Sequence, residues 1–155
     1  MQTLSGLDAS FLYLETAQTP MHVGTFCRYE LPPAPARPAY SLHRAVTAHI
    51  AQRLHLAPIF TRKLSPMPLD LGHPVWVQAN EVDLDFHIRK VKRGAITLSQ
   101  ALDKVTDLHA QRLDRSRPLW EFHVFDRVRC PDGSVCGALY CKIHHATLDG
   151  KSGTI

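Results

Sequence analysis

Two adjacent histidines, His144 and His145, stand near the carboxyl end of the sequence. Histidine has an unperturbed pKa close to neutrality, so a positioned imidazole can accept a proton and return it within one reaction cycle. Asp149 can anchor the ring or its loop, and Gly150 beside it leaves room for close approach of backbone or ligand. The stretch therefore predicts a proton-transfer centre. Because Ile155 follows so closely, we expect part of the catalytic machinery to lie outside this chain.

The run before the two histidines predicts how their rings are placed. Residues 136–143 are apolar and strand-like. Successive side chains of a strand point to opposite faces, so the two rings cannot act as one unit. If the strand continued through both, His145 would share a face with Ile143, and His144 with Lys142. One ring would then act as the base, while the other packs or makes a hydrogen bond. For an isolated pair, a purely structural role at a strand end is the more common outcome.

Other chemistries have weaker support in the sequence. No His-x-His or His-Glu-x-x-His spacing is present, so we expect no metal site. A tetrahedral site built from Cys130, Cys136, Cys141 and a histidine stands as an alternative, although the cysteines lack paired spacing. There is no Gly-x-Ser-x-Gly elbow, no cysteine in an activating context and no glycine-rich phosphate loop.

Composition narrows the class of protein. The 155 residues are 45% apolar, which suffices for the core of one ordinary domain. The excess of eighteen Lys and Arg over fourteen Asp and Glu gives +4. This charge favours anionic partners, such as a phosphate-bearing cofactor or a membrane surface, and falls short of a nucleic-acid-binding protein. The four cysteines form no secretory framework, so a reducing cytosol is expected. No apolar run approaches the ~20 residues of a membrane span, so any membrane contact is expected to be peripheral.

Two amphipathic helices are expected to flank the strands. Apolar residues recur at three- and four-residue spacings from 41 to 54, where Ser41 is a suitable N-cap. A second helix is predicted over 98–113, with Thr97 and Gln100 as a capping box. Its buried side is expected to hold Leu98, Leu102, Val105 and Leu108. Before both, residues 4–14 are expected to form a turn followed by a short helix, with Ser5 or Asp8 as its cap.

The remaining apolar runs predict strands. They cover 21–31, 61–67, 74–79, 86–92, 119–128 and 135–144. Four prolines between 32 and 38 form a stiff loop that cannot continue a sheet. Strands mixed with amphipathic helices indicate an α/β sandwich of the α+β kind, in which helices flank a mixed sheet. The order of the strands does not follow from one sequence.

A resemblance to a known family adds to this interpretation. The stretch 144–150 matches the HHxxxDG motif of the coenzyme A-dependent acyltransferase superfamily, which includes chloramphenicol acetyltransferase and peptide-synthetase condensation domains. Within it, the chain most resembles the bacterial wax ester synthase/acyl-CoA:diacylglycerol acyltransferase family. Four further segments carry that likeness, namely 4–12, 19–24, 82–89 and 112–121.

The resemblance implies a fold and a domain organisation. It implies a chloramphenicol acetyltransferase-like N-terminal half, with residues 1–155 as an N-terminal acyltransferase domain. Family members carry a second, C-terminal domain with its own motif, which we expect to be absent from this chain. The active-site tunnel of the superfamily lies between the two domains, so this chain is expected to supply the base and one wall.

The resemblance also implies an activity. Acyl-CoA is the expected acyl donor, no cofactor is tightly bound, and a fatty alcohol or diacylglycerol accepts the acyl group to give wax ester or triacylglycerol. His145 is the implied general base, whose Nε2 takes the proton of the alcohol and passes it to the departing thiolate. His144 and Asp149 are expected to hold the local geometry, and Gly150 keeps the approach open. No acyl-enzyme is needed.

The residues Pro118, Leu119 and Trp120 carry two interpretations of equal weight. They would line a channel for the acyl chain or the alcohol, or Trp120 would be a core residue at the start of a strand. Long apolar substrates require an apolar tunnel, which a sequence does not reveal.

Two other functions compete with the acyl-CoA-dependent enzyme. One is a condensation-type domain that takes acyl or aminoacyl groups only from carrier proteins. The other is a non-catalytic half that binds acyl-CoA or lipid and needs a partner chain. In each case we expect a cytoplasmic protein, peripheral at membranes or lipid inclusions, without nucleic-acid partners.

Overall fold

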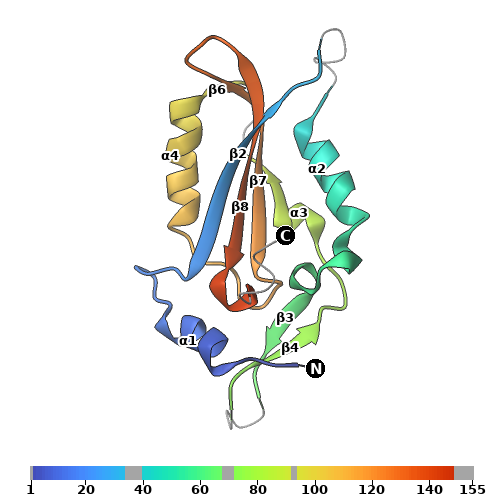
Figure 1. The fold of residues 1–155 in the computed structure, drawn as a ribbon, viewed down its shortest axis with the longest axis vertical. Helices are drawn as coiled ribbons and strands as arrows, with labels where there is room; N and C mark the ends of the chain where they lie inside the picture. The colour runs from blue at the N-terminus through green and yellow to red at the C-terminus, as the bar shows by residue number, and fades with distance from the viewer. Residues whose placement is uncertain (1, 34–39, 68–71, 92–93, 149–155) are drawn as a thin grey trace.

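Two sheets organise the molecule, as the computed structural model shows for residues 2–33, 40–67, 72–91 and 94–148 (Figure 1). The larger has the strand order β2-β8-β7-β5, with β6 also paired to β7; the smaller has the order β1-β4-β3. The helices are α1 Gly6–Leu14, α2 Leu42–Ala51, α3 Leu84–His87 and α4 Leu98–His109, with 3-10 turns η1 Leu54–Leu56, η2 Pro58–Phe60 and η4 His145–Thr147. The strands are β1 Gln2–Thr3, β2 His22–Glu30, β3 Arg62–Ser65, β4 Val75–Gln78, β5 Ile88–Lys90, β6 Ile96–Thr97, β7 Trp120–Arg129 and β8 Val135–His144.

The hairpin of β7 and β8 is the centre of the larger sheet. Its turn contains Gly133 at φ +83°, a left-handed conformation that suits glycine. On its other side β8 pairs antiparallel with β2, which places His22 opposite His144. Strands β5 and β6 run parallel to β7. The histidine pair therefore lies at the far end of the sheet from the hairpin turn.

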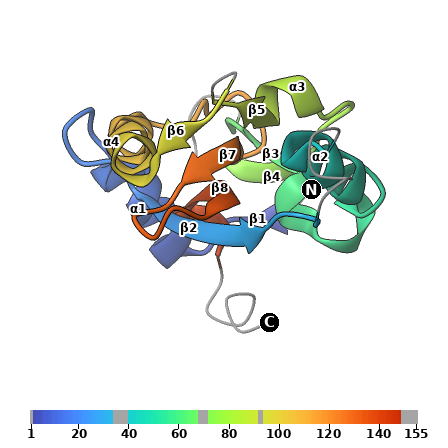
Figure 2. The same ribbon diagram turned by 90° about the horizontal axis from the view of Figure 1, so that it is seen from above.

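Helices α2 and α4 cover opposite faces of this sheet (Figures 1 and 2). On one face Trp120, Phe122 and Val124 of β7 pack with residues of α2. On the other face Phe125 and Tyr140 pack with residues of α4. This alternation along the strands follows from the two-residue period of β-structure. The expected sandwich of helices around a mixed sheet is confirmed.

Helices α2 and α4 begin where the sequence predicts and end earlier. Ser5 and Ser41 each accept a hydrogen bond from the backbone of the first helical turn, and Thr97 forms the expected capping box with Gln100. However, α2 ends at Ala51, not at residue 54, and α4 ends at His109, not at 113. Helix starts are marked by capping side chains, while these two ends carry no glycine or proline stop.

One expected strand is shorter than predicted, and one expected core position is wrong. The segment 86–92 begins with a helical turn, α3, because the Asp83 carboxylate caps it by accepting the Phe86 N–H. Among the described residues of this segment, the strand β5 covers Ile88–Lys90. In α4, Leu102 is 46% exposed, whereas Ala101 next to it is fully buried. The other three expected positions are confirmed, since Leu108 is buried and Leu98 and Val105 pack against the same cluster. The other five expected strands are present; strand 135–144 has its predicted bounds, and the ends of the other four are shifted.

Helix α1 and the smaller sheet close the end of the molecule where the histidines lie (Figure 1). Leu12 of α1, Trp76 of β4, Leu119 and Ala146 are buried in one cluster there. The residue after His145 is therefore fixed in a core. Within the described ranges, no helix is both long and apolar enough to span a bilayer.

Candidate active site

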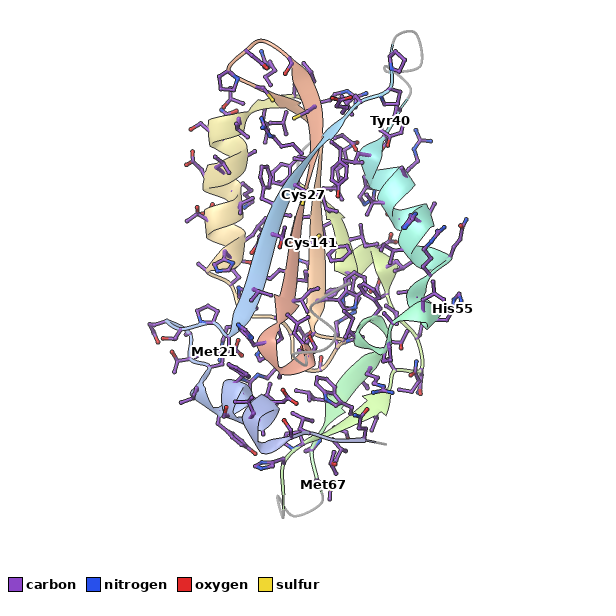
Figure 3. The ribbon with its side chains drawn as sticks, viewed as in Figure 1. Met21, Cys27, Tyr40, His55, Met67 and Cys141 are labelled. Carbon is purple, nitrogen blue, oxygen red and sulfur yellow. The ribbon has the colours of Figure 1, made fainter. Side chains whose placement is uncertain are left out.

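The two histidines lie on either side of a structural boundary. Strand β8 ends at His144, and the chain turns into the 3-10 turn η4 at His145. The His144 N–H donates to the Leu119 carbonyl at 3.0 Å, and the His145 N–H donates to the Met21 carbonyl at 2.9 Å. Met21 lies where the segment after α1 enters β2 (Figure 3). Two separate parts of the chain, at Leu119 and at Met21, thus fix the backbone of the pair.

His144 is a buried, internally bonded residue. Its side chain is fully buried, and its Nδ1 accepts the Ala146 N–H at 3.0 Å. A neutral ring must then carry its hydrogen on Nε2. Nε2 lies 3.5 Å from Oε1 of Glu15 and finds no hydrogen-bond partner among the described residues. Burial lowers the pKa of His144 to about 4, so the ring is neutral at pH 7.

His145 has a different environment. It is half-buried, and its ring stacks on Phe11 of α1 with centroids 4.7 Å apart and planes inclined by 16°. The next two residues, Ala146 and Thr147, line a pocket of about 400 Å³. The rest of this pocket is lined by Gln2, Thr3, Ser5, Asp8, Pro58, Ile59, Arg62 and Trp76. Of the two rings, His145 is the more exposed, and the residues that follow it in the chain line this pocket.

A buried ion pair holds the segments around the histidines together. Glu15 is 1% exposed at its side chain, and Oε2 accepts from Nε and Nη2 of Arg115 at 3.1 and 2.8 Å. The same Nη2 also donates to the Leu12 carbonyl. Burial alone raises the pKa of Glu15, but hydrogen bonds from the Met21 N–H and from Arg115 hold it below its usual value. The Glu15 carboxylate therefore holds three segments together: the end of α1, the residues that lead into β2, and the loop after α4.

Sequence reasoning missed Glu15. Arg115 falls in one of the segments that carry the family resemblance, but Glu15 stands alone after α1 and no spacing links it to the histidines. The partnership becomes visible only when the chain has folded, since the two residues lie 100 positions apart. Met21 acts through its backbone, so its side-chain type gives no sign of this role in the sequence.

His22 is a second buried imidazole beside His144. Its Nε2 donates to the carbonyl of His109, the last residue of α4, at 2.8 Å. Nδ1 is left as an acceptor without a hydrogen-bond partner in the described part of the chain. Burial lowers the pKa of His22 to about 4. Two neutral histidines therefore stand opposite each other on adjacent strands.

Lys142 of strand β8 anchors the C-terminal end of α4. It is 1% exposed, and Nζ donates to the carbonyls of Leu108 and Gln111, each at 2.9 Å. Glu121 lies 3.8 Å from Nζ and accepts from His123 at 3.0 Å. A cation suits the C-terminal carbonyls of a helix. The hydrogen bonds from Lys142 thus hold the C-terminal end of α4 in position.

The buried imidazoles predict an acid-sensitive fold. Both His22 and His144 have a pKa of about 4 when folded, against about 6.5 when unfolded. Between these values the unfolded chain binds protons that the folded chain does not, so stability is complete above pH 6.5 and falls towards pH 4. We expect a loss on the order of 2–3 kcal/mol for each group. Urea unfolding at pH 7.5 and pH 4.5 measures it.

A matched variant separates these histidines from other titrating groups. In His22→Gln the loss between pH 7.5 and pH 4.5 should shrink by roughly the share of one histidine. An equal loss in both proteins would show that His22 is not the group that titrates.

The tripeptide 118–120 is buried more deeply than a channel lining requires. Leu119 and Trp120 are fully buried, and the Trp120 indole N–H donates to the Phe60 carbonyl at 3.2 Å. The ring of His87 stacks on Trp120 at 4.3 Å. Pro118 lines a second pocket of about 480 Å³. The core position of Trp120 matches one of the two interpretations above, and the channel role stays a prediction.

Two predicted site residues, Asp149 and Gly150, lie outside the described residues, so their expected roles stay predictions. The cysteine site is not formed: the described ranges contain no group of three His, Cys, Asp or Glu side chains able to hold a metal ion.

Comparison with solved structures defines the class of fold. The chain superimposes on the starter condensation domain of rhizomide synthetase with a TM-score of 0.60 over 97% of this chain and 34% of that chain. At 13% identity this likeness concerns the fold alone. It superimposes on a wax ester synthase/diacylglycerol acyltransferase from Marinobacter aquaeolei with a TM-score of 0.73 and 32% identity, over 99% of this chain and 35% of that chain.

The family follows from the sequence match. The model of the wax ester synthase/diacylglycerol acyltransferase catalytic domain matches residues 4–155, and the chain belongs to this family. A curated relative, the probable diacyglycerol O-acyltransferase tgs2 of Mycobacterium tuberculosis, is 33% identical over 149 residues. The match covers 94% of this chain and 31% of the relative, so the chain spans about a third of the relative's length. The expected resemblance is confirmed.

Proposed function

We propose that this chain supplies the general base of an O-acyltransferase that moves a long-chain acyl group from acyl-CoA to a fatty alcohol or diacylglycerol. The contrast between the two histidines carries the proposal. His144 is fully buried and bonded to its own turn, whereas His145 is half-exposed beside a pocket and held through its backbone. A base must reach the proton that it removes, and only His145 meets that condition.

The reaction requires one proton to move twice. The neutral imidazole of His145 accepts the hydroxyl proton while the alcohol oxygen forms a bond to the thioester carbonyl carbon. The carbon–sulfur bond then breaks, and the same ring returns the proton to the departing thiolate. Such positioned transfer contributes about 10²–10⁴-fold to the rate, so orientation and stabilisation of the oxyanion supply the rest.

The neighbours of His145 have supporting roles. His144 accepts the Ala146 N–H and so holds the 3-10 turn on which His145 stands. We assign to Asp149 the anchoring of the following loop, and to Gly150 an open approach to the ring. Pro118 is the member of the tripeptide that lines a pocket, which makes it the best placed of the three to contact substrate.

The substrates and partners follow from the family. Acyl-CoA serves as a substrate, and no tightly bound cofactor takes part. We assign the facing wall of the active site to a second domain, in line with relatives that are about three times as long as the matched region. Leu7, Tyr13 and Leu14 of α1 are 61–71% exposed, on the helix whose Phe11 stacks on His145. These side chains support a peripheral contact with a lipid surface, from which apolar substrates arrive.

The test is a coupled assay of thiol release and ester formation. An active preparation that contains this chain is given palmitoyl-CoA with hexadecanol, or with a diacylglycerol. Release of coenzyme A in step with wax ester or triacylglycerol is expected. Turnover with an acyl group on a carrier protein, and none with palmitoyl-CoA, would instead identify a condensation-type domain.

A non-catalytic half that binds acyl-CoA or lipid is the second candidate, in line with the exposed apolar side chains of Leu7, Tyr13 and Leu14 on α1. Mass analysis after gel filtration reveals whether a second polypeptide accompanies the chain. Binding of palmitoyl-CoA without turnover, even with that polypeptide present, would support this candidate.

The stacking of Phe11 on His145 gives a prediction about rate. In Phe11→Ala the imidazole loses the surface that fixes its plane, so we expect the turnover number to fall about tenfold through lost orientation. The free energy of unfolding should fall by about 1–2 kcal/mol, since the ring is only half-buried. Phe11→Leu keeps volume without a flat face and serves as the control for packing. Full turnover in both variants would contradict an orienting role.

A further inference from the structure

A pair of thiols lies at the end of the sheet opposite the histidines. Cys130 and Cys136 flank the turn between β7 and β8, and their sulfur atoms are 3.4 Å apart in a hydrogen bond. Both residues are half-buried and both are free thiols. The tight turn keeps them together, since the Cys130 N–H donates to the Ser134 carbonyl at 2.9 Å. Two sulfurs at this separation need only small side-chain rotations to form a bond of ordinary length.

The surroundings shift the pKa values of the two thiols in opposite directions. A hydrogen bond from Cys136, together with Ser134 and the Arg28 guanidinium, lowers the pKa of Cys130. Nη1 of Arg28 lies 3.8 Å from the Cys130 sulfur. Burial and the neighbouring sulfur raise the pKa of Cys136 to about 11. Cys130 is therefore the more acidic thiol and Cys136 the less acidic one, the usual division between an attacking and a resolving cysteine.

We infer that Cys130 and Cys136 form a redox-active pair that reacts with small-molecule disulfides of the glutathione class and closes into an intramolecular disulfide. The Cys130 thiolate attacks one sulfur of the external disulfide, forms a mixed disulfide and expels one thiolate. Cys136 then loses its proton to solvent and attacks the Cys130 sulfur, which expels the second thiolate. The two cysteines are oxidised together, and the external disulfide is reduced to two thiols.

The other two cysteines provide an internal comparison. Cys27 of β2 and Cys141 of β8 lie along the strands, well away from the hairpin turn (Figure 3). In the strand register Cys27 faces Leu139 and Cys141 faces Thr25, so the two are not paired. Burial raises the pKa of Cys141 to about 12, which suppresses its thiolate. The chain thus contains one pair that is poised to react and two thiols that are not.

The pair is remote from the proposed chemistry. Strand β8 runs from Val135 next to the turn to His144 beside the base, a length of about 30 Å at about 3.4 Å per residue. Closing the disulfide links residues that are already in contact across one turn. We therefore expect it to leave the pocket beside η4 unchanged.

The test is a titration of the folded chain with mixtures of reduced and oxidised glutathione, read by thiol counting and peptide mass mapping. Two of the four free thiols should disappear, with the loss of two hydrogen masses and a cross-link between the peptides of Cys130 and Cys136. A cross-link that involves Cys27 or Cys141, or no cross-link under fully oxidised glutathione, would overturn the inference.

Single variants separate the two steps. Cys136→Ser should retain one glutathione on Cys130, because the resolving thiol is gone, whereas Cys130→Ser should take up little at either position. The double variant Cys27→Ser with Cys141→Ser should cross-link as the unaltered chain does. If Cys136→Ser is not glutathionylated faster than Cys130→Ser, the assignment of the attacking sulfur is wrong. Circular dichroism confirms that each variant is folded.

Discussion

Replacing His145 by alanine is expected to lower the turnover number of ester formation by about 10²–10⁴-fold, the usual contribution of one general base. The backbone N–H of residue 145 still donates to the Met21 carbonyl in this variant, so the 3-10 turn keeps its anchor. The ring is half-buried and stacks on Phe11. Its removal should therefore cost about 1 kcal/mol of stability or less. Thermal unfolding and an acyl-CoA plus hexadecanol assay measure the two quantities.

His144→Ala is the matched comparison, because it removes the neighbouring ring from the opposite environment. His144 is fully buried and its Nδ1 accepts the Ala146 N–H. Its loss leaves a cavity and an unsatisfied buried donor, which should cost about 2–4 kcal/mol. His145→Ala should thus mainly lose turnover, whereas His144→Ala should mainly lose stability. The opposite pattern would reverse the roles of the two histidines.

Arg115→Ala is expected to destabilise the fold by about 3 kcal/mol, because it strands the buried carboxylate of Glu15 without its cation. This value is at the lower end of the range for breaking a buried ion pair, since Arg115 itself is 40% exposed. Denaturant unfolding at pH 7 measures the loss. Turnover should fall as well, because Glu15 also accepts the Met21 N–H next to the anchor of His145.

Arg117 provides a control in the same loop. Its side chain is 39% exposed, almost as much as that of Arg115, but its partners Asp83 and Asp114 are themselves about half exposed. Arg117→Ala should therefore cost about 1 kcal/mol or less. In the Arg115→Ala background, Glu15→Gln should recover about half of the lost stability by removing the stranded charge. Equal losses for the two arginines would show that the buried pair has no special role.

Much of the fold follows from local sequence. Ser5, Ser41 and Thr97 cap helices because their side chains satisfy backbone N–H groups that the helix leaves free. The hairpin of β7 and β8 follows from two apolar runs around a turn with Gly133. In these places local preference and tertiary packing favour the same structure.

The site itself depends on long-range contacts. The pairing of Glu15 with Arg115, and of the Met21 carbonyl with the His145 N–H, joins segments far apart in the chain. Motifs indicate the two histidines, but they do not reveal which ring is buried. That distinction arises because β8 ends between the two rings and η4 begins. Likewise, a hydrogen bond from Lys142 holds the C-terminal end of α4, and the sequence of the helix itself gives no sign of this contact.

The most direct test of the central claim is chemical rescue of His145→Ala. Removal of the ring leaves a space beside Phe11 that free imidazole can enter and use to accept the alcohol proton. We predict that turnover of the variant rises about tenfold or more with added imidazole and saturates, while the unaltered enzyme does not respond. A variant that turns over at nearly the original rate without imidazole would contradict the assignment of His145 as the base.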